Sequence, residues 1–172
     1  MKIDLQPVGE IEKHILLQLK DRLHKVFGCP VAINGIVPIP GEAFNPERDQ
    51  YLSDIFLERL GVLKQPDTYI LGITDADLYT EGLNFVFGQA DVAGGVSVIS
   101  LHNLRQENYG LPADYDLLIE RALKEAVHEL GHNLGMGHCQ DGYCVMHFSN
   151  SLIDTDVKKA YFCGKCRPKL SM

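Results

Sequence analysis

The residues with the clearest chemistry lie near the end of the chain, in the run H-E-L-G-H-N-L-G-M-G-H from His128 to His138. Residues four apart lie one above the other on a helix, so His128 and His132 can offer two imidazole nitrogens to one metal ion. Glu129 lies between them and can act on a water molecule without being a ligand. Gly135 lets the chain leave the helix, with a positive φ, and brings His138 back as a third ligand. Three protein ligands leave one position open, which distinguishes a catalytic zinc from a structural one.

The competing interpretation of this run is a helix with two surface histidines and a glycine cap, but it explains neither Glu129 nor His138. The preceding segment supports a helix independently, because its apolar residues recur at helical spacing. These residues are Leu117, Leu118, Ala122, Leu123, Ala126, Val127 and Leu130. Either Asp114 or Asp116 is expected to cap the N-terminus of this helix.

Four cysteines follow the histidines: Cys139, Cys144, Cys163 and Cys166. Two pairs at loop spacing predict a structural zinc site made of four thiolates. Two disulfides or a redox pair are the alternative, but the chain has no secretory signal and its C-x-x-C pair is not near a strand–helix–strand unit. Iron–sulfur ligation also stays open, although the usual cysteine runs are absent. The remaining cysteine, Cys29, is interpreted as a small buried apolar residue.

The extended histidine motif resembles that of the metzincin zinc peptidases. A second hallmark of that clan is a turn with a methionine below the metal, and Cys144-Val145-Met146 matches it. The resemblance implies that Met146 places an apolar thioether under the zinc histidines without ligating the metal. Some metzincins have a tyrosine two residues after this methionine that approaches the metal. Phe148 holds that position here, so this turn offers no such tyrosine.

The complete set of motifs, H-E-x-x-H-x-x-G-x-x-H with C-x₄-C-x-M and a terminal C-x-x-C, is similar to that of the archaemetzincin family. The motifs cover residues 128–166 only. The resemblance implies a compact zinc-dependent peptidase with two Zn²⁺ ions per chain. It also implies that the three histidines hold the catalytic ion and that the four cysteines hold the structural one.

Composition limits the class of protein. At 172 residues the chain is long enough for one domain with a substantial core. Its formal net charge of −7 argues against nucleic-acid binding. No stretch approaches the roughly 20 apolar residues of a membrane span, and the first residues lack the apolar core of a secretory signal. We therefore expect a cytoplasmic protein with no nucleic-acid or membrane partner, while its oligomeric state stays open. The resemblance implies peptide or protein substrates.

Apolar patterns in the N-terminal part predict alternating strands and helices. The expected strands are 2–8, Val31–Ile39, Tyr69–Thr74, Asn84–Gly88 and Val96–Leu101, and the expected helices are Glu10–Phe27 and Gln50–Leu60, the second capped by Gly61. This order favours an α/β (α+β) fold, with a twisted mixed sheet under two helices and the active-site helix as the third. The resemblance makes the expected fold metzincin-like.

We expect a single catalytic domain over residues 1–172, with an N-terminal lobe (1–138) and a small C-terminal lobe (139–172). Few large apolar side chains follow His138, and so short a segment cannot build an adequate core alone. A zinc ion bound by the four cysteines would supply the missing stability. The substrate cleft would then run between the two lobes.

The resemblance also implies an edge strand that pairs with the substrate through its backbone. The segment Asn84–Gly88 is the candidate, with Phe85, Val86 and Phe87 as substrate-binding residues. The alternative is an ordinary core strand.

The function that these motifs favour is zinc-dependent peptide hydrolysis, with a water activated by the metal and Glu129 as general base. Two other functions remain open. The same residues would serve a zinc hydrolase of a non-peptide amide. A peptide-binding protein without turnover is the second, although a binding site has no need of the base.

Overall fold

The computed structural model describes residues 1–171, so Met172, the last residue of the predicted C-terminal lobe, lies outside the described residues. The strands are β1 (Lys2–Val8), β2 (Val31–Ile33), β3 (Phe44–Asn45), β4 (Gln50–Leu52), β5 (Thr68–Thr74), β6 (Leu78–Tyr79), β7 (Gly88–Asp91) and β8 (Val96–Ser100). The helices are α1 (Lys13–Phe27), α2 (Ser53–Leu63), α3 (Tyr115–Asn133) and α4 (Leu152–Val157). Short 3₁₀ turns lie at Gly41–Ala43, His102–Leu104, Gln106–Tyr109 and Arg167–Ser171.

The central sheet has five strands in the order β2-β1-β5-β8-β7. Strands β2, β1, β5 and β8 are parallel to one another, and β7 runs antiparallel at the edge beside β8. A second, small sheet has the order β3-β4-β6. The predicted α/β fold with a mixed sheet is confirmed.

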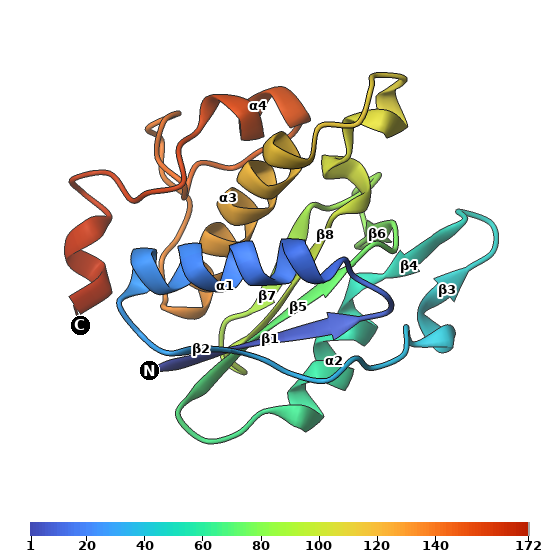
Figure 1. Cartoon of the computed structure of the whole chain (residues 1–172), viewed down its shortest axis with the longest axis horizontal. Helices are drawn as coiled ribbons and strands as arrows, with labels where there is room; N and C mark the ends of the chain where they lie inside the picture. The colour runs from blue at the N-terminus through green and yellow to red at the C-terminus, as the bar shows by residue number, and fades with distance from the viewer. Residues whose placement is uncertain (172) are drawn as a thin grey trace.

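The strand order explains where the helices lie. The chain moves from β1 to β2 in one direction along the sheet and then returns past β1 to β5. Because crossovers between parallel strands are right-handed, this reversal puts α1 and α2 on opposite faces of the sheet (Figure 1). Helix α3 follows β8 and packs on the same face as α1.

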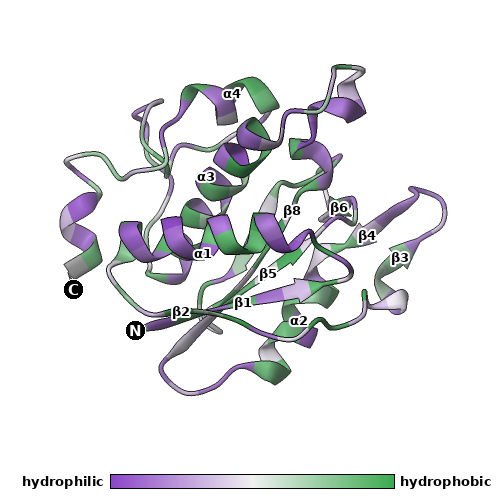
Figure 2. Ribbon diagram, viewed as in Figure 1, coloured by the Kyte–Doolittle hydropathy of each residue, from purple (hydrophilic) through white to green (hydrophobic). Residues whose placement is uncertain are grey.

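Alternation along the strands divides the core between the two faces. Leu71 and Ile73 of β5 join the cluster that contains α1 and α3, whereas Ile70 joins the cluster beneath α2. Helix α1 carries hydrophobic and hydrophilic residues on opposite sides, as its alternating colours in Figure 2 show. The amphipathic pattern that predicted this helix therefore reports its packing on the sheet.

Two predicted elements, the strand Val31–Ile39 and the helix Gln50–Leu60, differ in their bounds from the structure. The second strand ends at Ile33, and beyond it only Val37 bridges to Val8. The predicted helix Gln50–Leu60 begins late, because Gln50–Leu52 forms β4 and pairs with β3 and β6. That helix also continues through Gly61, so the predicted glycine cap was wrong.

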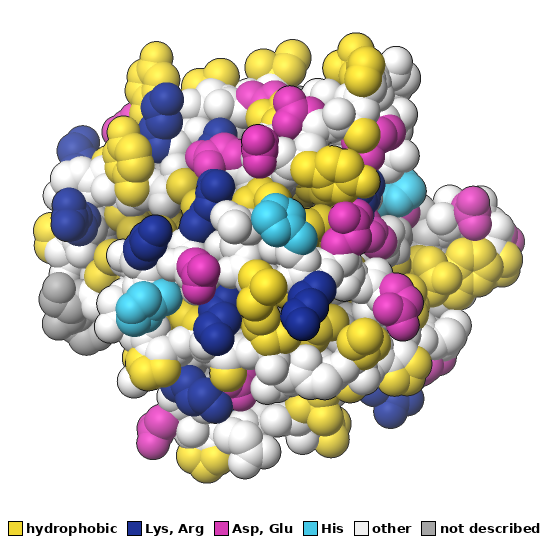
Figure 3. Space-filling view, viewed as in Figure 1, with side chains coloured by type: hydrophobic (Ala, Val, Ile, Leu, Met, Phe, Trp, Pro, Cys, Tyr) yellow, Lys and Arg dark blue, Asp and Glu magenta, His cyan; other side chains and the backbone are white. Residues whose placement is uncertain are grey.

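After α3 the chain has little regular structure other than α4 and the last 3₁₀ turn, and it lies along α3 (Figure 1). Its buried apolar residues, including Val145, Met146 and Phe162, join the core cluster of α1 and α3 and do not form a core of their own. Among residues 1–171, no helix is both long and apolar enough to cross a membrane. On the face drawn in Figure 3, acidic and basic side chains are interspersed.

Candidate active site

Helix α3 carries the histidine motif and has well-defined ends. The side chain of Asp114 accepts a hydrogen bond from the Leu117 N–H (2.9 Å), so Asp114 is the cap of the two candidates. At the other end, Gly135 has a positive φ, as predicted, with a value of 80°. Its N–H donates to the His132 carbonyl (2.9 Å). The chain turns back there and brings His138 towards the helix.

The structure brings the three predicted histidines together. Potential ligand atoms of His128, His132 and His138 all lie within 4.8 Å of one another. The Nε2 atoms of His128 and His132 are 3.0 Å apart. His128 is buried, His132 is half-buried and His138 is exposed, so the cluster opens to solvent on one side.

The other ring nitrogens are fixed by backbone carbonyls. Nδ1 of His128 lies 2.8 Å from the Val145 carbonyl, and Nδ1 of His132 lies 2.8 Å from the Met136 carbonyl. Because a carbonyl can only accept, each Nδ1 carries the proton, and the Nε2 lone pairs face each other. Two facing lone pairs at this distance repel unless a cation lies beside them, so the donor set fits a zinc ion. Burial above all lowers the pKa of His128 to about 2, which keeps its ring neutral.

Glu129 is buried beside this cluster. Burial first, and the neighbouring Glu125 second, raise the pKa of Glu129 to about 8, while the positive charge of Lys158 opposes them. Gly88 makes room for its side chain, because a Cβ at Gly88 would lie 2.7 Å from Glu129 Cγ and 2.9 Å from the Val98 carbonyl oxygen. The start of β7 can therefore pack against the Glu129 carboxylate only because residue 88 has no side chain.

A pocket of about 250 Å³ lies next to Glu129. Its walls come from the segment before β7, from α3 and from the turn after Met146. The lining residues are Leu83, Asn84, Phe85, Val86, Phe87, Gly88, Glu125, His128, Glu129, Phe148, Ser149 and Asn150. Both Glu129 and the predicted substrate-binding residues thus border one cavity.

The predicted strand Asn84–Gly88 was wrong in position, since β7 begins at Gly88 and Phe85, Val86 and Phe87 lie in the irregular segment before it. The Val86 N–H donates to the Leu78 carbonyl (2.9 Å), so it is not free to pair with a peptide. The apolar run of this segment reflects burial of Val86 and Phe87 in the core and not membership of the sheet.

The edge strand of the sheet beside Glu129 is β7, and β2 forms the opposite edge. The Ser100 N–H donates to the Phe87 carbonyl (2.8 Å), which fixes the register of the pair with β8. In an antiparallel ladder alternate residues bond to the partner strand, so the backbone groups of Gly88 and Ala90 point outward. The outward edge of β7 begins beside Glu129.

Met146 is fully buried against α3. A Cβ on Gly131 would collide with its sulfur and would lie 3.1 Å from its Cε, so the glycine within the histidine motif allows the close approach. The Met146 carbonyl accepts a hydrogen bond from the Cys139 N–H (2.8 Å), which ties this turn to the start of the cysteine cluster.

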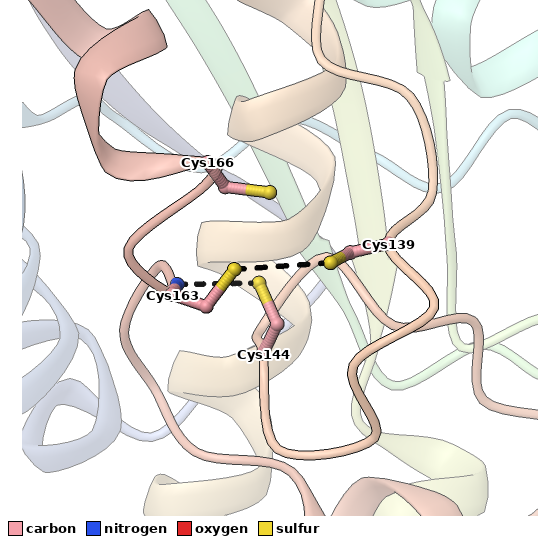
Figure 4. Close-up of side chains that lie close together, drawn as sticks. All are labelled: Cys139, Cys144, Cys163 and Cys166. Carbon is pink, nitrogen blue, oxygen red and sulfur yellow. Dashed lines mark hydrogen bonds between the residues drawn. The ribbon is translucent and has the colours of Figure 1, made fainter.

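The four predicted cysteines form a second cluster, and their Sγ atoms lie within 4.8 Å of one another (Figure 4). The Sγ atoms of Cys139 and Cys163 are 3.8 Å apart, and all four thiols are free. The Cys163 N–H points at Cys144 Sγ (3.4 Å). Hydrogen bonds from the N–H groups of Cys166 and Lys165 lower the pKa of Cys163 to about 7. Backbone donors thus support the sulfurs of Cys163 and Cys144, whereas burial raises the pKa of Cys144 and Cys166. Four cysteine sulfurs in one cluster suit zinc.

Several residues of the site were not singled out in the sequence. Ala90 was missed, and Gly88 was only the last residue of the predicted strand Asn84–Gly88, because the position of an edge depends on strand pairing. Glu125 lies four residues before Glu129, and this helical spacing was the available signal. Lys158 carries no signal, because nothing local distinguishes a buried lysine from an exposed one.

The fold and the cluster of three histidines, two on α3 and one just beyond it, define a zinc metallopeptidase. The family model described as peptidase family M54 matches residues 30–172. An archaemetzincin from Methanocaldococcus jannaschii is 46% identical over 99% of this chain and 93% of its own length. One from Pyrococcus furiosus is 46% identical over 95% of this chain and 89% of its own length. The chain therefore belongs to peptidase family M54, the archaemetzincins.

Solved structures agree with this membership. A zinc-dependent peptidase from Methanocorpusculum labreanum is similar with a TM-score of 0.90, at 34% identity over 98% of this chain and 99% of that one. An archaemetzincin from Archaeoglobus fulgidus, complexed with malonate, gives a TM-score of 0.85 at 38% identity over 98% of this chain and 99% of that one.

Proposed function

We propose that the chain hydrolyses peptide bonds with two zinc ions, one catalytic and one structural. His128, His132 and His138 hold the catalytic ion. The observation that carries this proposal is the pair of facing Nε2 atoms 3.0 Å apart, each ring being fixed through Nδ1. Cys139, Cys144, Cys163 and Cys166 hold the structural ion.

A zinc ion in the histidine cluster supplies a Lewis acid, which makes water more acidic and polarises the scissile carbonyl. Glu129 is the general base in this proposal. Its carboxylate takes the proton of the attacking water and returns it to the leaving amine. Its burial beside Gly88 keeps bulk water away from the proton that it carries.

The substrate is proposed to bind as an extended peptide along the outer edge of β7. The outward backbone groups of Gly88 and Ala90 pair with it and bring its scissile bond beside Glu129. Phe85, Val86 and Phe87 then act as a side-chain wall of the pocket. The backbone of Val86, which the sequence predicted to pair with the substrate, has no such role here, because its N–H is bonded to Leu78.

The whole chain is proposed to work as one catalytic domain, with residues 1–138 and 139–172 as its two lobes. Met146 supports the histidines from below through Gly131. Peptides or proteins are the substrates, and a reducing compartment such as the cytoplasm would keep the four thiols available for metal. Hydrolysis of a non-peptide amide stays a second candidate, because the pocket beside Glu129 also admits a small molecule.

The deciding experiment substitutes Glu129→Ala and measures peptide cleavage together with metal content. We expect activity on a mixed peptide library to fall by about 10²–10⁴-fold, because the general base is lost, while two zinc ions per chain remain. Glu120→Ala, a more exposed glutamate on the same helix, is the matched control and should cleave as the wild type does.

Cleavage by Glu129→Ala at the wild-type rate, in a preparation free of other proteases, would refute the proposed mechanism. A wild-type protein that cleaves small amides but no peptide in the library would instead favour the second candidate.

A further inference from the structure

A second carboxylate, that of Glu125, lines the same pocket as Glu129 one helical turn earlier on α3. Both side chains are buried, and like charges four residues apart on a helix repel each other. The proposed hydrolysis uses only one of them. Something must therefore hold Glu125 where it does not compete with Glu129.

The groups that hold Glu125 come from the C-terminal segment. The Thr155 hydroxyl donates to Glu125 Oε1 (3.0 Å), and Lys158 Nζ lies 3.0 Å from the same oxygen. Both partners are fully buried. The position of Glu125 is thus set by α4 and the residue that follows it, and not by α3 alone.

Lys158 is an unusual residue for an anchor. Its ammonium is in ion-pair contact with Glu125, yet within residues 1–171 it makes no hydrogen bond of good geometry. A buried cation is costly, and an apolar side chain of similar length would pack this position without that cost. Packing alone therefore does not explain why this position holds a positive charge.

We propose that Lys158 is a positioning residue for peptide hydrolysis: it keeps the Glu125 carboxylate against the C-terminal segment, so that Glu129 alone meets the substrate and the metal position. This inference rests on the role proposed for Glu129. Without Lys158, the Glu125 carboxylate lies uncompensated in the pocket wall. It is then free to turn towards the cation that the three histidines hold.

The chain offers a matched control in Lys124. This lysine is also buried, and its ammonium donates to the carbonyls of Thr155 (3.0 Å) and Asp156 (3.2 Å), at the same contact between α3 and α4. Lys158→Met and Lys124→Met therefore each remove one buried cation from one interface. Only the first leaves Glu125 without its counter-charge.

The test compares kcat and KM of full-length, zinc-loaded variants on one peptide that the wild type cleaves. We expect Lys158→Met to lower kcat by about 10–100-fold with little change in KM, and Lys158→Arg and Lys124→Met to stay near the wild type. The double variant Lys158→Met/Glu125→Gln should recover most of kcat, because the competing carboxylate is gone.

A second measurement follows the metal and not turnover. Cobalt(II) placed in the histidine site, with zinc kept in the cysteine site, should give a changed visible spectrum in Lys158→Met. The wild-type spectrum should return in the double variant and persist in Lys124→Met. A purely structural lysine would alter thermal stability in both single variants and leave the cobalt spectrum unchanged.

A folded, zinc-loaded Lys158→Met protein with the wild-type kcat and cobalt spectrum would overturn the proposal. So would a double variant as slow as the single one, because Lys158 would then act without Glu125. If Lys158→Met does not fold, Lys158→Leu, which is also neutral and cannot donate to Glu125, is judged by the same criteria. Glu129→Ala separates the two hypotheses: if it is active, the proposed function fails, and if it is inactive while Lys158→Met is normal, only this inference fails.

Discussion

Helix α3 meets the sheet and α1 through aliphatic side chains, whereas it meets α4 and Lys158 largely through charged ones. On the first side lie Ile119, Ala126 and Leu130. On the second, Arg121 binds Asp156 with two hydrogen bonds of 2.7 Å each, and Glu125 contacts Lys158. The difference teaches that residues 139–171 are attached by ionic contacts at α4 and Lys158, by the cluster of four cysteines and by a modest share of the apolar core.

Substitutions on the two sides of α3 should have different consequences. Loss of an aliphatic contact weakens the whole cooperative core. Loss of an ionic or metal contact should release the C-terminal segment first, while the sheet and α1 stay folded. The proposed active site needs both sides, because His128 lies on α3 and the carbonyl that holds its ring, that of Val145, lies in the C-terminal segment.

The largest expected effect follows from Cys163→Ser. Structural zinc sites contribute on the order of 10 kcal/mol of apparent binding free energy, and the C-terminal segment has little core to replace it. We expect one zinc per chain to be lost, and we expect protease to cut within residues 139–171 while the sheet resists. Metal analysis and limited proteolysis measure these two results.

Cys29→Ser is the control for this substitution, because Cys29 is a buried free cysteine outside the cluster. It should keep both zinc ions. Two zinc ions and full protease resistance in Cys163→Ser would contradict the view that the cysteine cluster holds this segment.

The next effect comes from the aliphatic side of α3, through Ile119→Ala. Ile119 is 1% exposed in the core, and such a truncation costs about 2–5 kcal/mol through lost burial and the cavity left behind. Chemical denaturation should show one cooperative transition at a lower midpoint, with both zinc ions retained. Ile153→Ala on α4, where the side chain is 74% exposed, should change the free energy of unfolding by less than about 0.5 kcal/mol. A separate early transition in Ile119→Ala would break the comparison.

The sequence predicts the histidine cluster and the cysteine cluster well because their information is local. The i and i+4 spacing of His128 and His132 needs only a helix, and Gly135 needs only the turn that follows it. The cysteines also lie close to one another along the chain, in two short loops. Their convergence in space follows once Met146 packs under Gly131.

The edge of the sheet and the faces of the helices could not be predicted in the same way. Phe85 to Phe87 read as a strand because they are apolar, yet strand membership depends on pairing with β8, which is not a local property. Likewise, α1 and α2 fall on opposite faces because the strand order is β2-β1-β5, and the order of strands is not written in either helix. Lys158 was missed for the same reason: its partner Glu125 is distant in sequence.

A smaller effect is expected at Gly131, where α3 packs closely against Met146 and Phe162 of the C-terminal segment. A Cβ there would collide with Met146 Sδ and lie 3.3 Å from the Phe162 ring, so Gly131→Ala overpacks the contact at a cost of about 1–3 kcal/mol. Because Met146 is displaced, affinity for the catalytic zinc should fall as well, which competition with a chelator measures. Gly61→Ala, in α2, has open space around it and should be neutral or stabilising. Equal chelator resistance of Gly131→Ala and the wild type would separate Met146 from the histidine site.

The smallest effect concerns Asp156→Asn on the charged side. Arg121 is buried and still donates to the Leu104 carbonyl (3.0 Å), and Asp156 is partly exposed, so we expect a loss of about 1–2 kcal/mol. The loss of stability in Asp156→Asn should differ from the other losses in its dependence on salt. Salt screens a partly exposed ion pair, so the difference between wild type and Asp156→Asn should shrink in 1 M sodium chloride. The cost of Ile119→Ala should not shrink, because it arises from packing. An Asp156→Asn cost that is unchanged by salt would mean that α4 is held by shape and hydrogen bonding, and the contrast between the two sides of α3 would lose its electrostatic basis.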